Sequence, residues 1–512
     1  MLFRGLGAFR LLWGLEMNGV RPPWENGTIL CEPTFQALPG LLKKNQQCLR
    51  QLSPKWADLR AIARRDVLEI LGLDPGDLSK PWVMCGHQPE VCHPGVWAKY
   101  FVSKGLAESS GAVAFNLVAD GDICRQMRLP FPLLSHDNRL SRGTLSVGQG
   151  PPGTSWEGAS LGKKLDKCDS IWDQLAHRFG LDPLGQKYCP IGQGSLSEAN
   201  SWQRRRAQLD LGLDLLDLKQ SQLCRSVGFG RFLTSILCEI QRFSALQNRA
   251  LAEFRIKQGR DNPAWPVANL GIEGEWYETP FWLFNTIQGP RMPLWLKAEN
   301  KTLLLGGEPG KCLARVNVEH QKGWLESLSK LGFEIRPKAL ANTLFLRWLV
   351  CDLFVHGLGG AVYDQVTDAL GRAWFGCEPP TFALVSATLR LPLPKVKESN
   401  EAALRREQRD LWWHPQRLCE PTGLNEADLK EWLSLRAQPE QNPRAKVLLW
   451  RLHSQANGHY RALDEEIIKA RRDKAANTLA DNREWPWIWY SDHSLRKLLC
   501  PLLDPQLYRS YG

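Results

Sequence analysis

The sequence predicts an α/β fold in which a parallel sheet is split by a large insertion and followed by a charged helical arm. In residues 81–122 and again in residues 335–395, short apolar strands end in glycine-containing loops that lead into helices. Residues 396–480 differ, because they are rich in both charge signs and have a helical pattern. With 512 residues, of which 43% are hydrophobic, the chain has room for about two to four domains.

Charge and hydrophobic patterning argue against nucleic-acid and membrane partners and favour a small anionic substrate. The net charge of +11 is spread along the chain, and even the most charged stretch, residues 395–485, is nearly balanced. The sequence has no zinc-finger spacing, RNP-like strand or basic block, so we expect no nucleic-acid partner. No window approaches the length of a membrane span, so we expect no membrane partner. The mild positive balance suits a small anionic substrate.

The cysteines indicate a reducing compartment. Fourteen cysteines are scattered along the chain without a CxxC pair, as is typical of reduced and mostly buried thiols. Near the start, Arg4, Arg10 and Glu16 interrupt the apolar residues, which argues against a secretory signal. We therefore expect a cytoplasmic protein, for which Met17 is an alternative start.

The elements before the insertion follow from apolar spacing. Residues 1–80 are expected to be a helical and irregular region, in which residues 55–72 form an amphipathic helix that ends at Gly72. Residues 81–122 then predict a βαβ unit, the first part of the core. Its strand, helix and strand are expected over residues 82–85, 96–109 and 112–119.

Residues 123–334 are expected to be an insertion or connecting region. Residues 130–200 are rich in Gly, Pro and Ser and predict loops, whereas residues 202–257 have a helical pattern. Residues 261–310 are rich in Trp and Pro and predict strands and loops.

The core resumes over residues 335–395 and is followed by the arm. We expect a helix, a strand, a helix and a strand over residues 339–350, 352–356, 361–375 and 382–386. The arm, residues 396–480, is interrupted by Pro415, Pro421, Pro439 and Pro443. The last segment, residues 481–512, is expected to pack back on the body.

The loop after the first core strand suits an anion. Its glycines let backbone N–H groups and a helix N-terminus point at one place. Its histidines are candidates for acid/base catalysis, and its lysine can meet a phosphate or carboxylate. The alternative is that these residues only shape a turn, in which the histidines are half-buried and have no role in binding. The candidate residues are Gly86, His87, Gln88, His93, Gly95 and Lys99.

A zinc site in the same loop is a weaker alternative. Cys85, His87, Cys92 and His93 offer four ligands, but their C-x-H-x4-C-H spacing is not a familiar zinc pattern. We therefore predict no metal held by these residues.

Polar residues also follow the second core strand. Asp120 and Asp122 can hold a ribose, an amine or Mg²⁺ at the strand end, and Asn116 interrupts the apolar run before them. We expect Asp122 to act in catalysis and the other two in binding. The alternative is a turn in which an Asp caps the next segment.

A second glycine loop follows the strand near residues 352–356. Its glycines provide a backbone cradle for an anion, although GLGGAVYD is not the dinucleotide-binding fingerprint. Asp364 near the helix N-terminus is alternatively only a partner of the helix dipole. The two glycine loops together predict one ligand cleft. The candidate residues here are His356, Gly359, Gly360, Tyr363 and Asp364.

These segments resemble the bacillithiol-biosynthesis cysteine-adding enzymes, a family of cysteine ligases. GHQPEVCHPGVWAKYF, AFNLVADGD, DLFVHGLGGAVYDQVTDAL and FALVSATLRL match the family's loop, acidic strand end, glycine loop and final strand in order and approximate spacing. The match covers residues 81–122 and 335–391, and the charged arm agrees with the family's helical coiled-coil extension.

The resemblance implies a Rossmann-like, nucleotidylyltransferase-like core and a reaction that joins the carboxyl of cysteine to the amine of glucosaminyl malate. It implies that the first loop lines the site and that Asp120 and Asp122 hold the amine or a sugar hydroxyl. Gly359, Gly360 and Tyr363 would close the opposite side.

We therefore expect a ligase or transferase that joins an amine of the cysteine or sugar-amine type to a small anionic substrate, in bacillithiol-like thiol metabolism. ATP or another nucleotide with Mg²⁺ is a candidate cofactor, and a homodimer through the arm is a candidate assembly. Two alternatives stay open: a nucleotidylyltransferase-like enzyme that uses the same cleft, and a non-catalytic scaffold that binds a partner through the arm.

Overall fold

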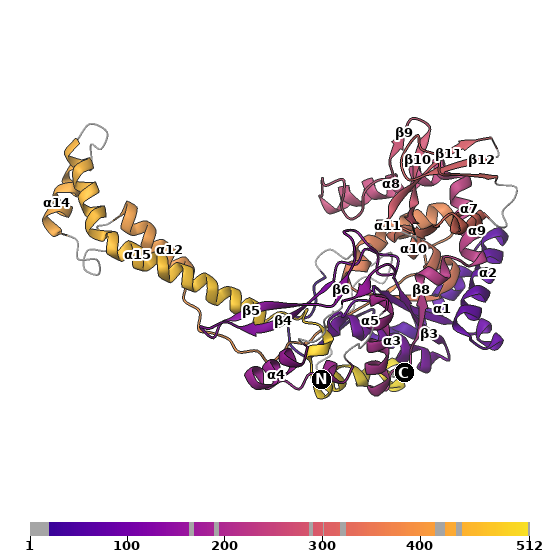
Figure 1. Ribbon diagram of the computed structural model, residues 1–512, viewed down its shortest axis with the longest axis horizontal. Helices are drawn as coiled ribbons and strands as arrows, with labels where there is room; N and C mark the ends of the chain where they lie inside the picture. Colours follow the sequence, from indigo (N-terminus) through magenta and orange to yellow (C-terminus); the bar gives the residue numbers. More distant parts are fainter. Residues whose placement is uncertain are drawn as a thin grey trace. The chain divides into compact units, whose positions relative to one another are not determined.

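The computed structural model describes residues 20–162, 168–188, 194–285, 290–300, 302–317, 324–414, 425–436 and 443–509. The fold is mixed α/β, as the sequence predicts, and the chain forms two compact units (Figure 1). The expectations about the first residues, Met17 included, lie outside the described part. One unit comprises Met1–Phe131, Thr144–Arg390 and Arg483–Gly512; the other comprises Pro132–Gly143 and Leu391–Asn482.

A six-stranded sheet is the centre of the first unit. Five neighbouring strands are parallel and β1 is added antiparallel at one edge. Each predicted core strand is present within a few residues of its expected position. In spatial order the strands are β1 (Thr28–Glu32), β16 (Ala383–Thr388), β15 (Leu353–His356), β2 (Trp82–His87), β3 (Val113–Val118) and β8 (Leu216–Lys219).

Helices cover both faces of this sheet. On one face, Met84 of β2 and Phe354 of β15 share a hydrophobic core with several helices. On the other, α3 (Pro94–Ser110) packs on β2 and β3, and its Ser103 lies beside Cys85. The helices of the first core include α2 (Pro54–Leu71), α7 (Val227–Cys238), α8 (Ile240–Gln258), α10 (Ala339–Phe345) and α11 (Leu358–Phe375).

The strand order reverses direction between β15 and β2. The β2–α3–β3 unit runs toward one edge of the sheet, and the β15–α11–β16 unit runs toward the other. Since such crossovers are right-handed, the two helices lie on opposite faces, as observed. In open α/β sheets the carboxyl ends of the strands at this switch point are where ligands bind.

Two strands of the main sheet come from regions that were expected to lie outside the core. β1 lies within residues 1–80, and β8 lies within the stretch 202–257 that had a helical pattern. The expectation of continuous helix there is wrong, because leucines at alternate positions pair as a strand with β3. Helices α5 (Leu196–Asp210) and α6 (Gln220–Leu223) flank β8, and α7 and α8 follow it.

The Trp- and Pro-rich segment forms a second, antiparallel sheet, which confirms its expected strand character. Its order is β13-β12-β11-β10-β14, with β9 paired to β10. Helix α9 (Trp324–Lys330) precedes β14. The strands are β9 (Ile272–Glu273), β10 (Trp276–Asn285), β11 (Met292–Glu299), β12 (Thr302–Gly306), β13 (Ala314–Asn317) and β14 (Phe333–Pro337).

The remaining elements of the insertion are short. Two pairs of strands form separate two-stranded sheets, and helix α4 (Cys168–Phe179) follows them. The pairs are β4 (Arg128–Leu134) with β5 (Leu140–Ser146), and β6 (Gly148–Gln149) with β7 (Ser160–Leu161). The expectation of loops over residues 130–200 is therefore only partly right.

The final segment packs on the body, as expected. In the 3-10 helix η6 (Trp487–Trp489), the ring of Trp487 lies 4.6 Å from that of Trp97 on α3. The indole of Trp489 donates a hydrogen bond to the carbonyl of Pro130 at 2.7 Å. Helix α16 (Asp492–Leu499) follows and buries its leucines. These contacts hold α3, and with it the loop that begins this helix.

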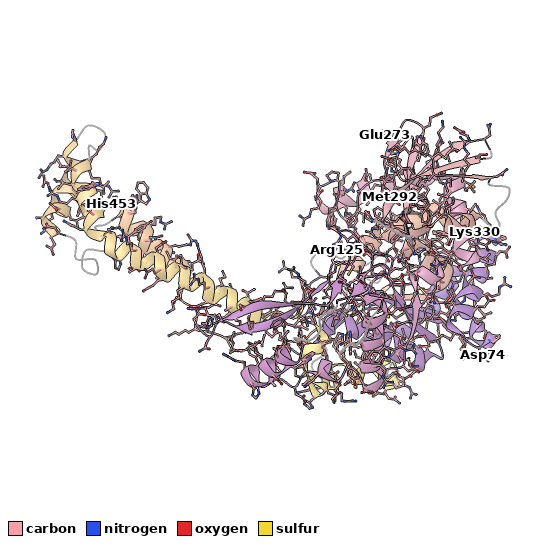
Figure 2. All side chains as sticks on the ribbon, viewed as in Figure 1. Asp74, Arg125, Glu273, Met292, Lys330 and His453 are labelled. Carbon is pink, nitrogen blue, oxygen red and sulfur yellow. The ribbon has the colours of Figure 1, made fainter. Side chains whose placement is uncertain are left out.

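The charged segment of the second unit is helical, as predicted. Helices α12 (Glu401–Trp413) and α14 (Glu426–Leu435) pack on the long α15 (Pro443–Ala480), around leucines and Trp432. His453 of α15, labelled in Figure 2, stacks on Trp412 with ring centroids 4.0 Å apart. Pro415, Pro421 and Pro439 lie outside the described residues. Among the described residues, no helix has the length and apolarity needed to cross a membrane.

Candidate functional site

Lys99 is a buried cation at the switch point between β2 and β15. Its side chain rises from α3, and its Nζ donates to the carbonyl of Gly86 at 2.9 Å, while the residue is only 4% exposed. Among the described residues, no carboxylate forms an ion pair with it. Burial lowers the pKa of Lys99, and the nearby Glu90 carboxylate opposes that shift. The ammonium therefore has N–H donors for which no acceptor is described, and a charge for which no carboxylate partner is described.

The same ammonium lies beside the N-terminus of α11. A Cβ added to Gly357 would lie 3.8 Å from Lys99 Nζ. Gly357 is the N-cap of α11, no side chain caps this helix, and its first turn has no acidic residue. The N–H groups of the first turn have no partner within the helix and carry a partial positive charge. Lys99 and α11 thus present two sources of positive potential to one place.

His87, the last residue of β2, lies close enough to Lys99 to be affected by its charge. Its Nδ1 lies 3.1 Å from the carbonyl of Gln88 and 3.7 Å from Glu90. No described residue bonds to its Nε2. Burial, and next the charge of Lys99, lower the pKa of His87, so the ring is neutral near pH 7. A neutral imidazole with a free nitrogen can accept a proton.

Asp122 faces the site from the end of β3. Its carboxylate accepts from the amide of Gln88 at 2.9 Å and from Arg291 at 2.9 Å. Arg291 in turn lies over the ring of Trp282, 4.3 Å from its centroid. The phenol of Tyr363 on α11 is close enough that the Asp122 charge helps to raise its pKa, after burial. The expected residues that lie around the switch point therefore include His87, Gln88, Lys99, Asp122 and Tyr363.

His356 and Asp364 form a buried pair at the end of β15. His356 Nε2 lies 2.6 Å from the carboxylate of Asp364, which also accepts from Arg347 at 2.8 Å. Arg347 comes from a π-helical turn, Leu346–Val350, that extends α10. Such turns are frequent at functional sites. Because the pair is fully buried, Asp364 does more than balance the helix dipole.

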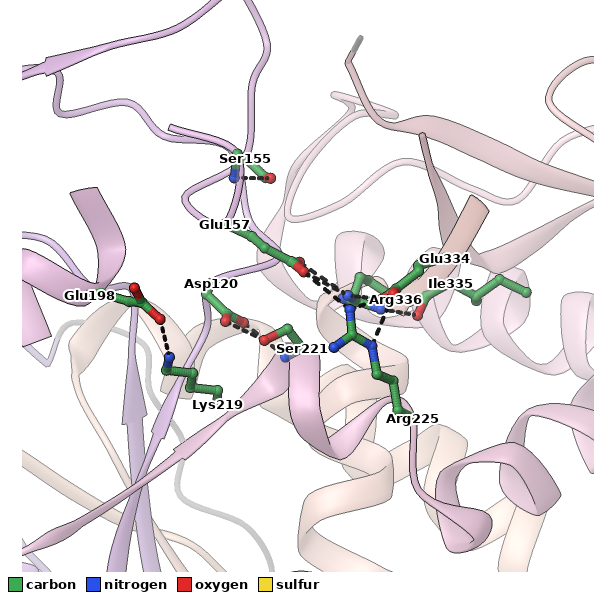
Figure 3. Close-up of polar contacts among 11 residues, drawn as sticks. Asp120, Ser155, Glu157, Glu198, Lys219, Ser221, Arg225, Glu334, Ile335 and Arg336 are labelled. Atoms are coloured by element: carbon green, nitrogen blue, oxygen red, sulfur yellow. Dashed lines mark hydrogen bonds and ion pairs between the residues drawn. The ribbon is translucent and has the colours of Figure 1, made fainter. Parts of the chain in front are cut away.

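Asp120 and Asn116 form hydrogen bonds with other side chains of the protein. Asp120 accepts from the N–H and hydroxyl of Ser221 at 2.9 and 2.6 Å, and thereby caps α6 (Figure 3). Asn116 donates to Asp217 at 2.9 Å inside the sheet. Asp120 thus caps a helix, but one that follows about a hundred residues later and not the next segment of the chain. Gly359 has open space around it, whereas Gly360 packs against His356.

His93 and Gly95 shape the start of α3. His93 Nδ1 accepts from the N–H of Gly95 at 3.1 Å, as an N-cap. A Cβ on Gly95 would lie 2.4 Å from the carbonyl of Ala387, so only glycine fits against β16. His93 lies near enough to His87 to influence it, yet one of its nitrogens is committed to the cap.

We expect His93 to make the protein sensitive to mild acid. Burial and the nearby Arg483 lower its pKa to about 3, so between pH 6.5 and 5 the unfolded chain binds more protons than the folded chain, and stability falls as the pH drops. His93→Asn keeps a good cap without this titration. In urea unfolding at pH 7 and pH 5, wild type should lose about 1–2 kcal/mol more than the variant. Equal losses would contradict this expectation.

A second charged cluster lies beyond the end of β3. Arg336 is 1% exposed, pairs with Glu334 and lies 3.1 Å from Glu157, while Arg225 also bonds to Glu334 (Figure 3). Two arginines and two carboxylates balance one another. A Cβ on Gly121 would lie 3.1 Å from the Arg336 side chain, so this cluster fixes the turn that carries Asp122.

Three of the four candidate zinc ligands, Cys85, His87 and His93, have different partners. Cys85 Sγ lies 3.9 Å from the Asn116 side chain, and His93 Nδ1 is used in the cap of α3. Within the part of the chain that the structure describes, no group of three or more His, Cys, Asp or Glu side chains is placed to hold a metal ion.

Sequence reasoning missed three residues of this neighbourhood. Arg291 and Arg347 lie far from the glycine loops in the sequence and reach them only through the tertiary fold. Glu90 lies in the first loop, and its charge acts on Lys99 and His87. Only Glu90 had a local signal, its position between two candidate residues.

Comparison with known proteins gives no match for this chain. A scan of protein-family models gives no match to the chain, and no curated protein is significantly similar to it.

Proposed function

We propose that the chain is a ligase- or transferase-type enzyme that binds the anionic group of a small substrate at the switch point of a Rossmann-like core. The buried Lys99 carries this proposal, because an ammonium with no ion-pair partner among the described residues is costly unless an anion joins it. The uncapped N-terminus of α11 beside it supports the same ligand chemistry.

The other side chains of the site suit an amine nucleophile. Asp122 is partly exposed and keeps acceptor capacity for an amine or a hydroxyl, while Gln88 and Arg291 fix its position. His87 has a nitrogen that no described residue binds, so the ring is placed to take up the proton that the amine loses, and its lowered pKa makes it a weak base that releases this proton readily.

The reaction we propose is amide formation with a carboxyl activated as a mixed anhydride. The amine nitrogen bonds to the carbonyl carbon, the bond from that carbon to the phosphate oxygen breaks, and His87 takes the proton. The resemblance to cysteine ligases in residues 81–122 and 335–391 suggests cysteine and a sugar amine as the two reactants.

The site fits the phosphate part of a nucleotide. Lys99 and the first turn of α11 supply the donors that a phosphate needs. Asp122 and Glu90 are described carboxylates near the site that could approach a Mg²⁺ ion, and Asp122 is already bound to Arg291. When bound, ATP would supply the activating phosphoryl or adenylyl group.

A thermal-shift panel tests the proposal. ATP, CTP, cysteine, glucosaminyl malate and related sugar amines are added with and without Mg²⁺ to wild type, Lys99→Met and Lys104→Met. We expect a ligand that raises Tm for wild type and Lys104→Met but not for Lys99→Met, since ligand at 100 times Kd adds about 2.7 kcal/mol. Lys104 is a matched control because it lies on α3 and pairs with Glu108 at 3.3 Å.

The products then separate the enzyme classes. An amide product supports the ligase, whereas release of pyrophosphate with a nucleotidyl product supports the nucleotidylyltransferase alternative. No Lys99-dependent response across the panel would contradict the proposal and favour a scaffold that works through the helical arm.

A further inference from the structure

We propose that His356 accepts a hydrogen bond from an O–H group of the bound anion, so that the site binds phosphate in preference to sulfate. The inference rests on the proposed anion site at Lys99, and it assigns a ligand chemistry to that site: the bound group is inorganic phosphate or a terminal phosphate that keeps an O–H, and not a bridging phosphate of a nucleotide. It differs from the role of His87, because His356 would select what binds rather than take a proton from the amine.

The geometry places His356 beside the anion site. A Cβ on Gly360 would lie 2.7 Å from His356 Nδ1, and a Cβ on Gly357 would lie 3.8 Å from Lys99 Nζ. Gly357 and Gly360 are three residues apart at the start of α11, so they lie on the same side of the helix. His356 Nδ1 and Lys99 Nζ therefore flank the same turn.

The partners of His356 fix which nitrogen carries its proton. The carboxylate of Asp364 can only accept, so His356 Nε2, 2.6 Å away, is the donor. In the neutral ring Nδ1 then has a lone pair, and no described residue donates to it. Arg347 binds Asp364 from the other side and holds the carboxylate in place. Asp364 and Arg347 are thus positioning residues.

Burial, and not the sum of the nearby charges, keeps the ring neutral. Asp364 faces it from α11, Arg347 from the π-helical turn and Lys99 from α3, while the rings of Phe354 and Phe382 pack against it. Burial is the largest influence and lowers the pKa of His356; the Asp364 carboxylate raises it, the two cations Arg347 and Lys99 lower it, and the net direction is downward. A neutral acceptor persists at the pH where the site would work.

A neutral acceptor among donors selects between oxoanions. Lys99 and the α11 N–H groups donate to any anion. Near neutral pH inorganic phosphate keeps at least one O–H, which can donate to His356 Nδ1, whereas sulfate has none. A sulfate oxygen would face the lone pair of Nδ1 and leave it without a partner. We expect phosphate to bind about tenfold more tightly than sulfate, about 1.4 kcal/mol.

The test is calorimetric titration of the full chain at pH 7 with inorganic phosphate and with sulfate. His356→Gln is the informative variant, because its amide can still donate to Asp364 while the acceptor at the Nδ1 position is lost. His356→Asn is the matched control, since its side chain reaches the Nδ1 position and can accept there. Thermal unfolding of each variant accompanies the titrations.

The expected result is a preference for phosphate in wild type and His356→Asn that disappears in His356→Gln. Long-range ¹H–¹⁵N NMR spectra should show the His356 proton on Nε2. Lys99-dependent binding of both anions without preference, or a preference that survives in His356→Gln, would overturn the inference and leave the anion site standing. Absence of any Lys99-dependent anion binding would overturn the proposed function and this inference with it.

Discussion

Lys99→Met should weaken anion binding strongly without destabilising the fold. The ammonium is 4% exposed, and its described hydrogen-bond acceptor is the carbonyl of Gly86. Replacing a buried charge that lacks an ion pair by an apolar side chain of similar length is neutral or stabilising, here by up to about 2 kcal/mol. Losing a charge-assisted hydrogen bond to the ligand costs about 1.5–3 kcal/mol, so affinity should fall roughly ten- to hundredfold.

Urea unfolding and calorimetric titration of inorganic phosphate measure the two effects separately. Lys104→Met is the control on the same helix, because its surface pair with Glu108 contributes about 0–1 kcal/mol and lies outside the site. If Lys99→Met lost about 3 kcal/mol of stability and kept its affinity, Lys99 would be a structural cation.

Arg347→Met should be the most destabilising of the substitutions considered. The guanidinium is 2% exposed and bonds to the carboxylates of Asp364 and Asp368 at 2.8 and 2.7 Å. Removing one partner of a buried ion pair leaves the other charge uncompensated, which costs about 3–5 kcal/mol. Urea unfolding at pH 7 measures the loss.

The pH dependence distinguishes this cause from lost packing. Arg347 and His356 lower the pKa of Asp364 against the effect of burial, so in wild type this carboxylate contributes stability above the unfolded pKa that is lost as the pH falls. In Arg347→Met a protonated Asp364 is tolerated, so the difference from wild type should narrow between pH 7 and pH 4. A loss of the same size at both values would point to packing instead.

Arg372→Met is the control for Arg347→Met. Arg372 lies on α11 and pairs with Glu378 at 2.9 Å, but in contrast to Arg347 both of these side chains are about half exposed. Exposed pairs of this kind contribute about 0–1 kcal/mol. The control should therefore leave stability within that range.

Local sequence patterns predicted the two βαβ units well. The apolar runs of β2 and β3, the helix between them and its stop at Gly111 are all local signals, and the structure has each within a few residues. The pairing of β2 with β15 joins distant parts of the sequence, because β15 follows β2 by more than two hundred residues. Glycine loops at both strand ends nonetheless predicted their proximity.

Other features depend on contacts that no local pattern carries. β8 lies in a leucine-rich stretch whose spacing is compatible with a helix. Its pairing with β3 is what makes this segment a strand. Arg291 reaches Asp122 from the second sheet, 169 residues later in the chain. His93 had a local signal that was not used, since a proline at the first position of α3 marks the preceding residue as the N-cap.

A crystal structure of the full chain with inorganic phosphate tests the central claim most directly. We predict one bound phosphate within hydrogen-bonding distance of Lys99 Nζ and of the N–H groups at the start of α11, with an oxygen directed at His356 Nδ1. Phosphate bound only elsewhere, with Lys99 still donating to Gly86 and no density at the start of α11, would contradict it.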